Sequence, residues 1–164
     1  PGAAVLGSLS KAFAAPGRRV GWAVGDPEVL APARLVHNAM VSCLSRPAQA
    51  AAAALVASSD SVFPRVRAQL AARREIFRTA ARDHLGWDPP EPAGGFYAWL
   101  PLPREGRTDP RAFCLAVRDR GGVIVIPGSA FGSRGVPYAR VSWAGSPADI
   151  TEGVRRLSAF WRDE

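Results

Sequence analysis

The stretch SLSKAFAAPGRRVG, residues 8–21, decides how we interpret this 164-residue sequence. It holds Lys11, the single lysine of a chain whose other basic residues are all arginines. A strong arginine bias with abundant Ala, Gly and Pro is typical of a GC-rich coding sequence, in which one lysine can arise by drift. An arginine, however, stays protonated at physiological pH, whereas a desolvated lysine amine can lose its proton and attack a carbonyl. Lys11 is therefore a candidate for amine chemistry.

The composition predicts a chain that buries a core but does not bind nucleic acid. Its length suits one domain, or one domain plus part of another, and 48% of its residues are hydrophobic. The net charge of +7 invites a nucleic-acid interpretation. The arginines are scattered through helix-like segments, as in residues 73–82, and no basic cluster alternates with exposed aromatic residues. We therefore predict solvated helical faces.

Cysteine and histidine placement adds no second chemistry. Cys43 and Cys114 lie far apart in apolar stretches, which predicts buried thiols rather than a disulfide. His37 and His84 lack metal-ligand spacing, so we predict no metal site. No apolar run approaches 18 residues and no signal peptide opens the chain, so we expect a cytoplasmic protein without a membrane partner. Because Pro1 opens what resembles a strand under way, we expect the C-terminal part of a longer protein.

Strand and helix signals alternate along the chain and predict an α/β fold. Strand-like segments are residues 3–10, 20–25, 96–102 and 138–144, and residues 123–132 are a strand that runs into a glycine-flanked loop. We expect the strands in residues 3–10 and 123–132 to be buried. Helix signals begin at Asp26-Pro27, Pro47, Ser61, Asp109-Pro110 and Ser146-Pro147. The Pro/Gly-rich residues 87–95 are a linker, which predicts domains at residues 1–86 and 87–164.

Ser8, Lys11 and Arg19 form a candidate site. A strand end followed by a Gly/Pro loop can bring these three side chains together. Hydroxyls and a guanidinium are the donors that a phosphate dianion needs. A lysine beside a phosphate site suggests a cofactor with both an aldehyde and a phosphate, and pyridoxal 5'-phosphate has both.

Three segments resemble one known family, the class I/II or fold-type I pyridoxal-phosphate enzymes of the aspartate aminotransferase superfamily. The family's Schiff-base motif is Ser-x-Ser-Lys, a short spacer and x-Gly-x-Arg-x-Gly, matched here by Ser8, Ser10, Lys11, Gly17, Arg19 and Gly21. GGFYAWLPLP, residues 94–103, resembles the first strand of the family's small domain. Residues 123–144 resemble the segment that ends in the arginine for the substrate α-carboxylate, here Arg140.

The resemblance implies a role for each matched residue. Lys11 would form the Schiff base and move the proton, while Ser8 and Arg19 would hold the cofactor phosphate. Arg140 would bind the substrate carboxylate in a bidentate pair. Ser10 can equally bond to the backbone, and Phe131 either lines the pocket or packs. The implied fold is the end of the large three-layer α/β/α domain with its bridging helix, followed by the small α/β domain.

The implied function is an aminotransferase that moves an amino group from an amino acid to a 2-oxo acid, acting as a homodimer. The family's other ring-binding residues precede its lysine, so we expect half a site here: a chain that is inactive alone and exposes apolar surface. A C–S lyase or decarboxylase on the same fold would share these residues. A sensor domain of a transcription regulator and an inactive partial gene product are further alternatives.

Overall fold

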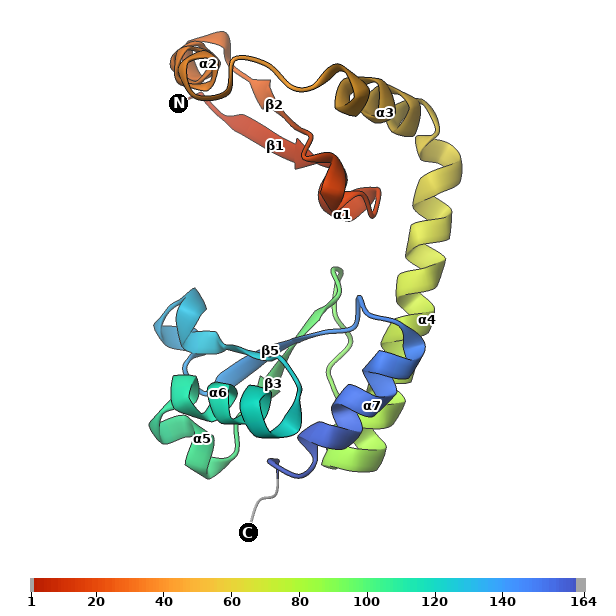
Figure 1. The fold of residues 1–164 in the computed structure, drawn as a ribbon, viewed down its shortest axis with the longest axis vertical. Helices are drawn as coiled ribbons and strands as arrows, with labels where there is room; N and C mark the ends of the chain where they lie inside the picture. Colours follow the sequence, from red (N-terminus) through yellow and green to blue (C-terminus); the bar gives the residue numbers. More distant parts are fainter. Residues whose placement is uncertain (1, 162–164) are drawn as a thin grey trace. The chain divides into compact units, whose positions relative to one another are not determined.

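The computed structural model describes residues 2–161, which divide into two compact units between Ala68 and Gln69. The first unit contains β1 (Ala4–Ser8), α1 (Leu9–Ala12), a 3-10 turn (Pro16–Arg18), β2 (Gly21–Gly25), α2 (Pro27–Val41), α3 (Arg46–Ala57) and the first part of α4 (Ser59–Leu85). The second contains the rest of α4, β3 (Tyr97–Pro101), α5 (Arg104–Thr108), α6 (Pro110–Gly121), β4 (Ile126–Pro127), 3-10 turns at Gly128–Phe131 and Ser133–Gly135, β5 (Tyr138–Ser142) and α7 (Pro147–Leu157) (Figure 1).

Helices begin where the sequence predicts them, because the capping residues act locally. Asp26 caps α2 by accepting a hydrogen bond from the Glu28 amide at 2.9 Å. Asp109 caps α6 and Ser146 caps α7 in the same way, each followed by a proline at the first helical position. These three predicted helix starts are confirmed.

The two compact units divide inside α4, between Ala68 and Gln69, and the domain boundary between residues 86 and 87 stays a prediction. The reason for the division inside α4 lies in the second half of that helix. Phe77 and Ala80 are buried, and they belong to the hydrophobic core of the second unit. The helix we assigned to the first domain therefore contributes its C-terminal half to the core of the second unit.

The sheet of the first unit is an antiparallel hairpin of β1 and β2. The strand predicted at residues 3–10 is present as β1 over Ala4–Ser8, and residues 9–10 already belong to α1. Our expectation that this strand is buried is wrong, because Val5 is 71% exposed and Leu6 79%. An apolar strand is buried only where other elements cover it, and none of the described elements covers these side chains. The expected exposure of apolar surface on this chain is thus confirmed.

The sheet of the second unit has the strand order β3-β5-β4, with both pairs antiparallel. One face carries Leu100, Ala139 and Val141, which are buried in a core that α4, α6 and α7 complete. Residues alternate across a strand, so the opposite face presents Tyr97, Trp99 and Arg140. The strand and following loop predicted for residues 123–132 are present as the short β4 and the 3-10 turn after it. The predicted burial holds only in part, since Val125 is buried but Ile124 is 74% exposed.

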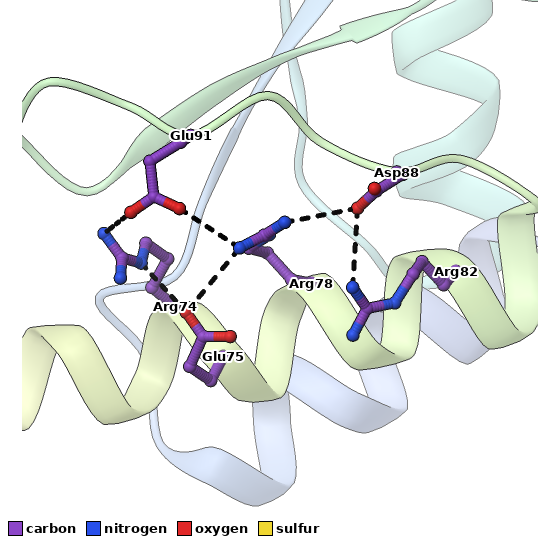
Figure 2. Close-up of polar contacts among 6 residues, drawn as sticks. All are labelled: Arg74, Glu75, Arg78, Arg82, Asp88 and Glu91. Atoms are coloured by element: carbon purple, nitrogen blue, oxygen red, sulfur yellow. Dashed lines mark hydrogen bonds and ion pairs between the residues drawn. The ribbon is translucent and has the colours of Figure 1, made fainter.

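Ion pairs join the linker after α4 to one face of that helix (Figure 2). Glu91 lies 2.7 Å from Arg74 and 3.2 Å from Arg78, while Asp88 lies 3.4 Å from Arg78 and 3.5 Å from Arg82. We predicted a solvated arginine face, but the side chains of Arg74 and Arg78 are only 27% and 20% exposed. These arginines hold the linker against α4 and so fix where β3 begins.

The two cysteines differ in their environment. Both are free thiols. Cys114 is buried in the core of the second unit, as predicted, whereas Cys43 is exposed and that part of the prediction is wrong.

Candidate active site

The three predicted cofactor-binding residues lie at the closed end of the β1–β2 hairpin. Strand pairing extends to Ser8, and the next amide, that of Leu9, donates to the Val20 carbonyl at 3.1 Å. Arg19 directly precedes Val20, and Lys11 lies in α1, which starts immediately after Ser8. The register of the hairpin therefore places a hydroxyl, an amine and a guanidinium at the same end of one small sheet.

Ser8 is held by its role as the cap of α1. Its Oγ accepts a hydrogen bond from the Ser10 amide at 3.0 Å, and its backbone is extended with φ −155° and ψ 146°. Because the oxygen acts as the acceptor in this bond, the hydroxyl proton can still be donated to a ligand oxygen. Ser10 contributes its backbone N–H to the same turn.

Arg19 adopts a strained backbone conformation. Its φ of 53° and ψ of 41° lie in the left-handed region, which residues other than glycine rarely occupy. One guanidinium nitrogen, Nη1, donates to the Pro16 carbonyl at 3.1 Å, and the side chain is otherwise exposed. A guanidinium has five N–H donors, so this bond leaves most of them to bind an anion. Backbone strain of this kind is typical of functional sites.

Lys11 lies on the outer surface of a well-anchored short helix. Leu9, the first residue of α1, is fully buried, and Phe13, just after the helix, is 7% exposed. The Phe13 ring contacts that of Phe63 in α4, with centroids 4.7 Å apart. Leu9 and Phe13 thus hold α1 in place, while the Lys11 side chain remains accessible.

Arg140 belongs to the second unit, on the face of the sheet opposite its core. Its guanidinium carbon lies 4.4 Å from the centroid of the Tyr97 ring and 4.6 Å from that of Phe131. Both distances are typical of cation–π contacts. Between residues 2 and 161, no carboxylate lies within ion-pair distance of this half-buried guanidinium. Arg140 is thus a cation that an incoming carboxylate can neutralise.

The sequence alone did not identify Tyr97 and Trp99 as part of this site. The alternation in FYAWL was the available signal, since it places both rings on one face of a strand. Trp99 is the direct cross-strand partner of Arg140, and its ring lies edge-on to Phe131 with centroids 5.3 Å apart. Phe131, for which we left two roles open, contacts Arg140 itself.

The chain belongs to the family described as aminotransferase class I and II, whose profile matches residues 1–157. The L-glutamine–4-(methylsulfanyl)-2-oxobutanoate aminotransferase of Bacillus subtilis is 35% identical to it over 150 residues, which are 92% of this chain and 37% of that enzyme. The LL-diaminopimelate aminotransferase of Moorella thermoacetica is 33% identical over 161 residues, 96% of this chain and 40% of that enzyme. The chain thus spans about two fifths of the length of the curated relatives it matches.

Solved structures show the same fold. The substrate-bound BacF of Bacillus subtilis superimposes with a TM-score of 0.83 at 28% identity, covering 96% of this chain and 40% of that one. The aspartate aminotransferase of Rhizobium meliloti gives a TM-score of 0.74 at 30% identity, covering 96% and 41%. The predicted fold class, an α/β part of the fold-type I architecture, is confirmed.

The family depends on pyridoxal 5'-phosphate, and the donor set at the hairpin end fits this cofactor. An amine suits its aldehyde, and a hydroxyl with a guanidinium suits its phosphate. Ser8, Lys11 and Arg19 supply these groups.

None of the helices between residues 2 and 161 has both the length and the hydropathy that crossing a membrane requires.

Proposed function

We propose that the protein to which this chain belongs is a pyridoxal-phosphate-dependent aminotransferase, moving an amino group from an amino acid to a 2-oxo acid. The observation that carries the proposal is the placement of Ser8, Lys11 and Arg19 at one end of the β1–β2 hairpin. Three of the relatives described above support the proposal, because their names are those of aminotransferases. The amino acid and 2-oxo acid substrates and a homodimeric assembly are part of this proposal.

The residues of the hairpin end would hold the cofactor and move one proton. Bound pyridoxal phosphate supplies an electron sink for the substrate Cα. Lys11 would hold the cofactor at its aldehyde group, and the Lys11 Nζ would also take a proton from the substrate Cα and return it. Ser8 would donate its hydroxyl proton to the phosphate, and Arg19 would neutralise the charge of that phosphate.

Arg140 would bind the substrate's α-carboxylate. A guanidinium presents two parallel N–H groups to a carboxylate, which fixes the direction of the bound group as well as its position. Holding the carboxylate in this way orients the bonds at Cα. An arginine rather than a lysine suits this task, since an ammonium is a point charge without that directional pair.

The test is to locate the cofactor and then to assay its chemistry. The full-length protein is mixed with pyridoxal phosphate, reduced with borohydride and mapped by peptide mass. We expect the adduct on the peptide that contains Lys11, and no adduct in the Lys11→Arg variant. The control variant Arg18→Ala keeps Lys11 and should still carry the adduct. An adduct that persists in Lys11→Arg, or full activity of that variant, would overturn the proposal.

An amino-donor screen then assigns the reaction. Amino-group transfer to a 2-oxo acid supports the proposal. Cleavage or decarboxylation without transfer would instead assign a C–S lyase or decarboxylase, and cofactor binding without turnover would assign a sensor domain.

Two expectations stay predictions from the sequence. They are that residues 1–164 alone are inactive and that the protein is cytoplasmic.

A further inference from the structure

We propose that Tyr97 and Phe131 are positioning residues, which hold the Arg140 guanidinium in the orientation that receives the substrate carboxylate. This inference rests on the proposed function of Arg140. It adds that two aromatic rings prearrange the arginine, which has no carboxylate partner among residues 2–161.

The two rings reach Arg140 from opposite sides of its strand. Tyr97 belongs to β3 and Phe131 to the turn directly after β4, while β5, which carries Arg140, is the middle strand of the order β3-β5-β4. The guanidinium carbon lies within 4.6 Å of both ring centroids. A side chain contacted from both flanking strands has few alternative rotamers.

Among the described residues, the two rings contact Arg140 while no hydrogen bond occupies its guanidinium N–H groups. A guanidinium that contacts rings through its planar face keeps its N–H edge available for a bidentate pair with a carboxylate. A carboxylate neighbour would also hold the side chain, but it would compete with the substrate for the same N–H groups. Because an unrestrained arginine loses rotamer freedom on binding, prior restraint by the rings strengthens binding of the carboxylate.

The rings are themselves supported. Trp99 meets Phe131 edge-on at an interplanar angle of 79°, and Phe96 lies 4.5 Å from Tyr97 between ring centroids. Tyr97 is 37% exposed and Phe131 49% exposed, so neither fills the hydrophobic core. Shortening either ring therefore changes the site without leaving a core cavity.

The test compares carboxylate affinity in the full-length holoenzyme. The variants are Tyr97→Leu and Phe131→Leu, and the control Phe160→Leu removes a ring from a different arginine, Arg120. The readouts are KM for the amino acid, kcat at saturation, and the dissociation constant of a substrate-like carboxylic acid that lacks the amino group, from a spectral titration. We expect Tyr97→Leu and Phe131→Leu to raise KM and the dissociation constant about tenfold each. We expect kcat to change less than KM, and Tyr97→Phe to restore the affinity.

The outcomes separate this inference from the proposed function. If Arg140→Lys leaves carboxylate affinity unchanged, the role of Arg140 itself is refuted. If Arg140→Lys weakens affinity but Tyr97→Leu and Phe131→Leu do not, the positioning role of the rings is refuted and the role of Arg140 stands. Equal weakening by Phe160→Leu would also overturn the inference, since the effect would then be a general loss of folding.

Discussion

Gly128 and Gly135 meet backbone to backbone at the base of the loop that carries Phe131. A Cβ atom built on either residue would overlap the carbonyl group of the other, and one on Gly128 would also lie 2.7 Å from the Tyr138 carbonyl oxygen. The neighbouring atoms belong to the backbone and cannot rotate away. Two glycines thus let the loop close tightly, which brings Phe131 to Arg140.

The first prediction follows from this close approach. Gly128→Ala and Gly135→Ala should each destabilise the full-length protein by about 1–3 kcal/mol, because the added methyl group forces the backbone apart. The same displacement moves Phe131, so we expect KM for the amino acid to rise. Thermal unfolding and steady-state kinetics measure the two effects.

Gly153→Ala is the matched control for these variants. Gly153 lies inside α7, and a Cβ there would meet nothing within 4 Å. Alanine in a helix interior is favoured over glycine by about 0.5–1 kcal/mol, so this variant should be more stable with unchanged KM. If Gly128→Ala behaved like Gly153→Ala, the tight loop would have no role in the site.

A second prediction concerns the strained backbone of Arg19. Glycine adopts a φ of 53° without the cost that a side chain incurs, which is about 1–2 kcal/mol. Arg19→Gly should therefore not lower the stability of the cofactor-free protein, although glycine also adds freedom to the unfolded chain. Binding of pyridoxal phosphate should nevertheless weaken at least tenfold, because a charged phosphate ligand is lost. Equilibrium titration and thermal unfolding of the cofactor-free protein measure both quantities.

The neighbouring arginine provides the control. Arg18→Ala removes the same charge from an exposed position of the 3-10 turn, so cofactor affinity should change less than threefold. Equal weakening in the two variants would mean that net charge, and not a specific contact of Arg19, attracts the phosphate.

Much of the hairpin site could be predicted because its signals are local in the sequence. Ser8, Lys11 and Arg19 lie within twelve residues, and a Gly/Pro turn between two strand-like segments suffices to place them at one end of a hairpin. The helix starts at Asp26 and Ser146 were predictable for the same reason, since a cap depends on the next three residues.

The surroundings of Arg140 could not be derived in this way. Tyr97 and Phe131 are far from it along the chain and meet it only because β5 lies between β3 and β4, an order that no local pattern specifies.

The predicted burial of the strand that carries Val5 and Leu6 was wrong for a related reason. Apolar character shows what a strand tends to bury, but whether it is buried depends on which elements lie beside it.

The third prediction concerns the core that supports the Arg140 sheet. Phe77 of α4 is 2% exposed, and its ring centroid lies 5.5 Å from that of Trp143 and 6.3 Å from that of Trp87. Phe77→Ala should lower the free energy of unfolding by about 3–5 kcal/mol through the cavity it leaves. Denaturant unfolding followed by tryptophan fluorescence measures the change. Phe77→Leu fills most of that cavity and should cost less than half as much; equal losses would show that the ring contacts, rather than the volume, stabilise this core.

The last prediction concerns Cys114, whose thiol is buried on α6. Burial disfavours the charged thiolate and raises the pKa of the Cys114 thiol to about 11. The thiolate is the reactive form, so Cys114 in the native protein should resist iodoacetamide at pH 8.5 and react once the protein is denatured, as peptide mapping would show. Rapid labelling of the native protein would contradict the burial.

The raised pKa of Cys114 also makes the stability depend on pH. Because the thiol has a higher pKa in the folded than in the unfolded state, its contribution to the free energy of unfolding is fully present below pH 9. This contribution is lost as the pH rises toward 11. Cys114→Ala should therefore show a smaller loss of stability than the unaltered protein over that pH window.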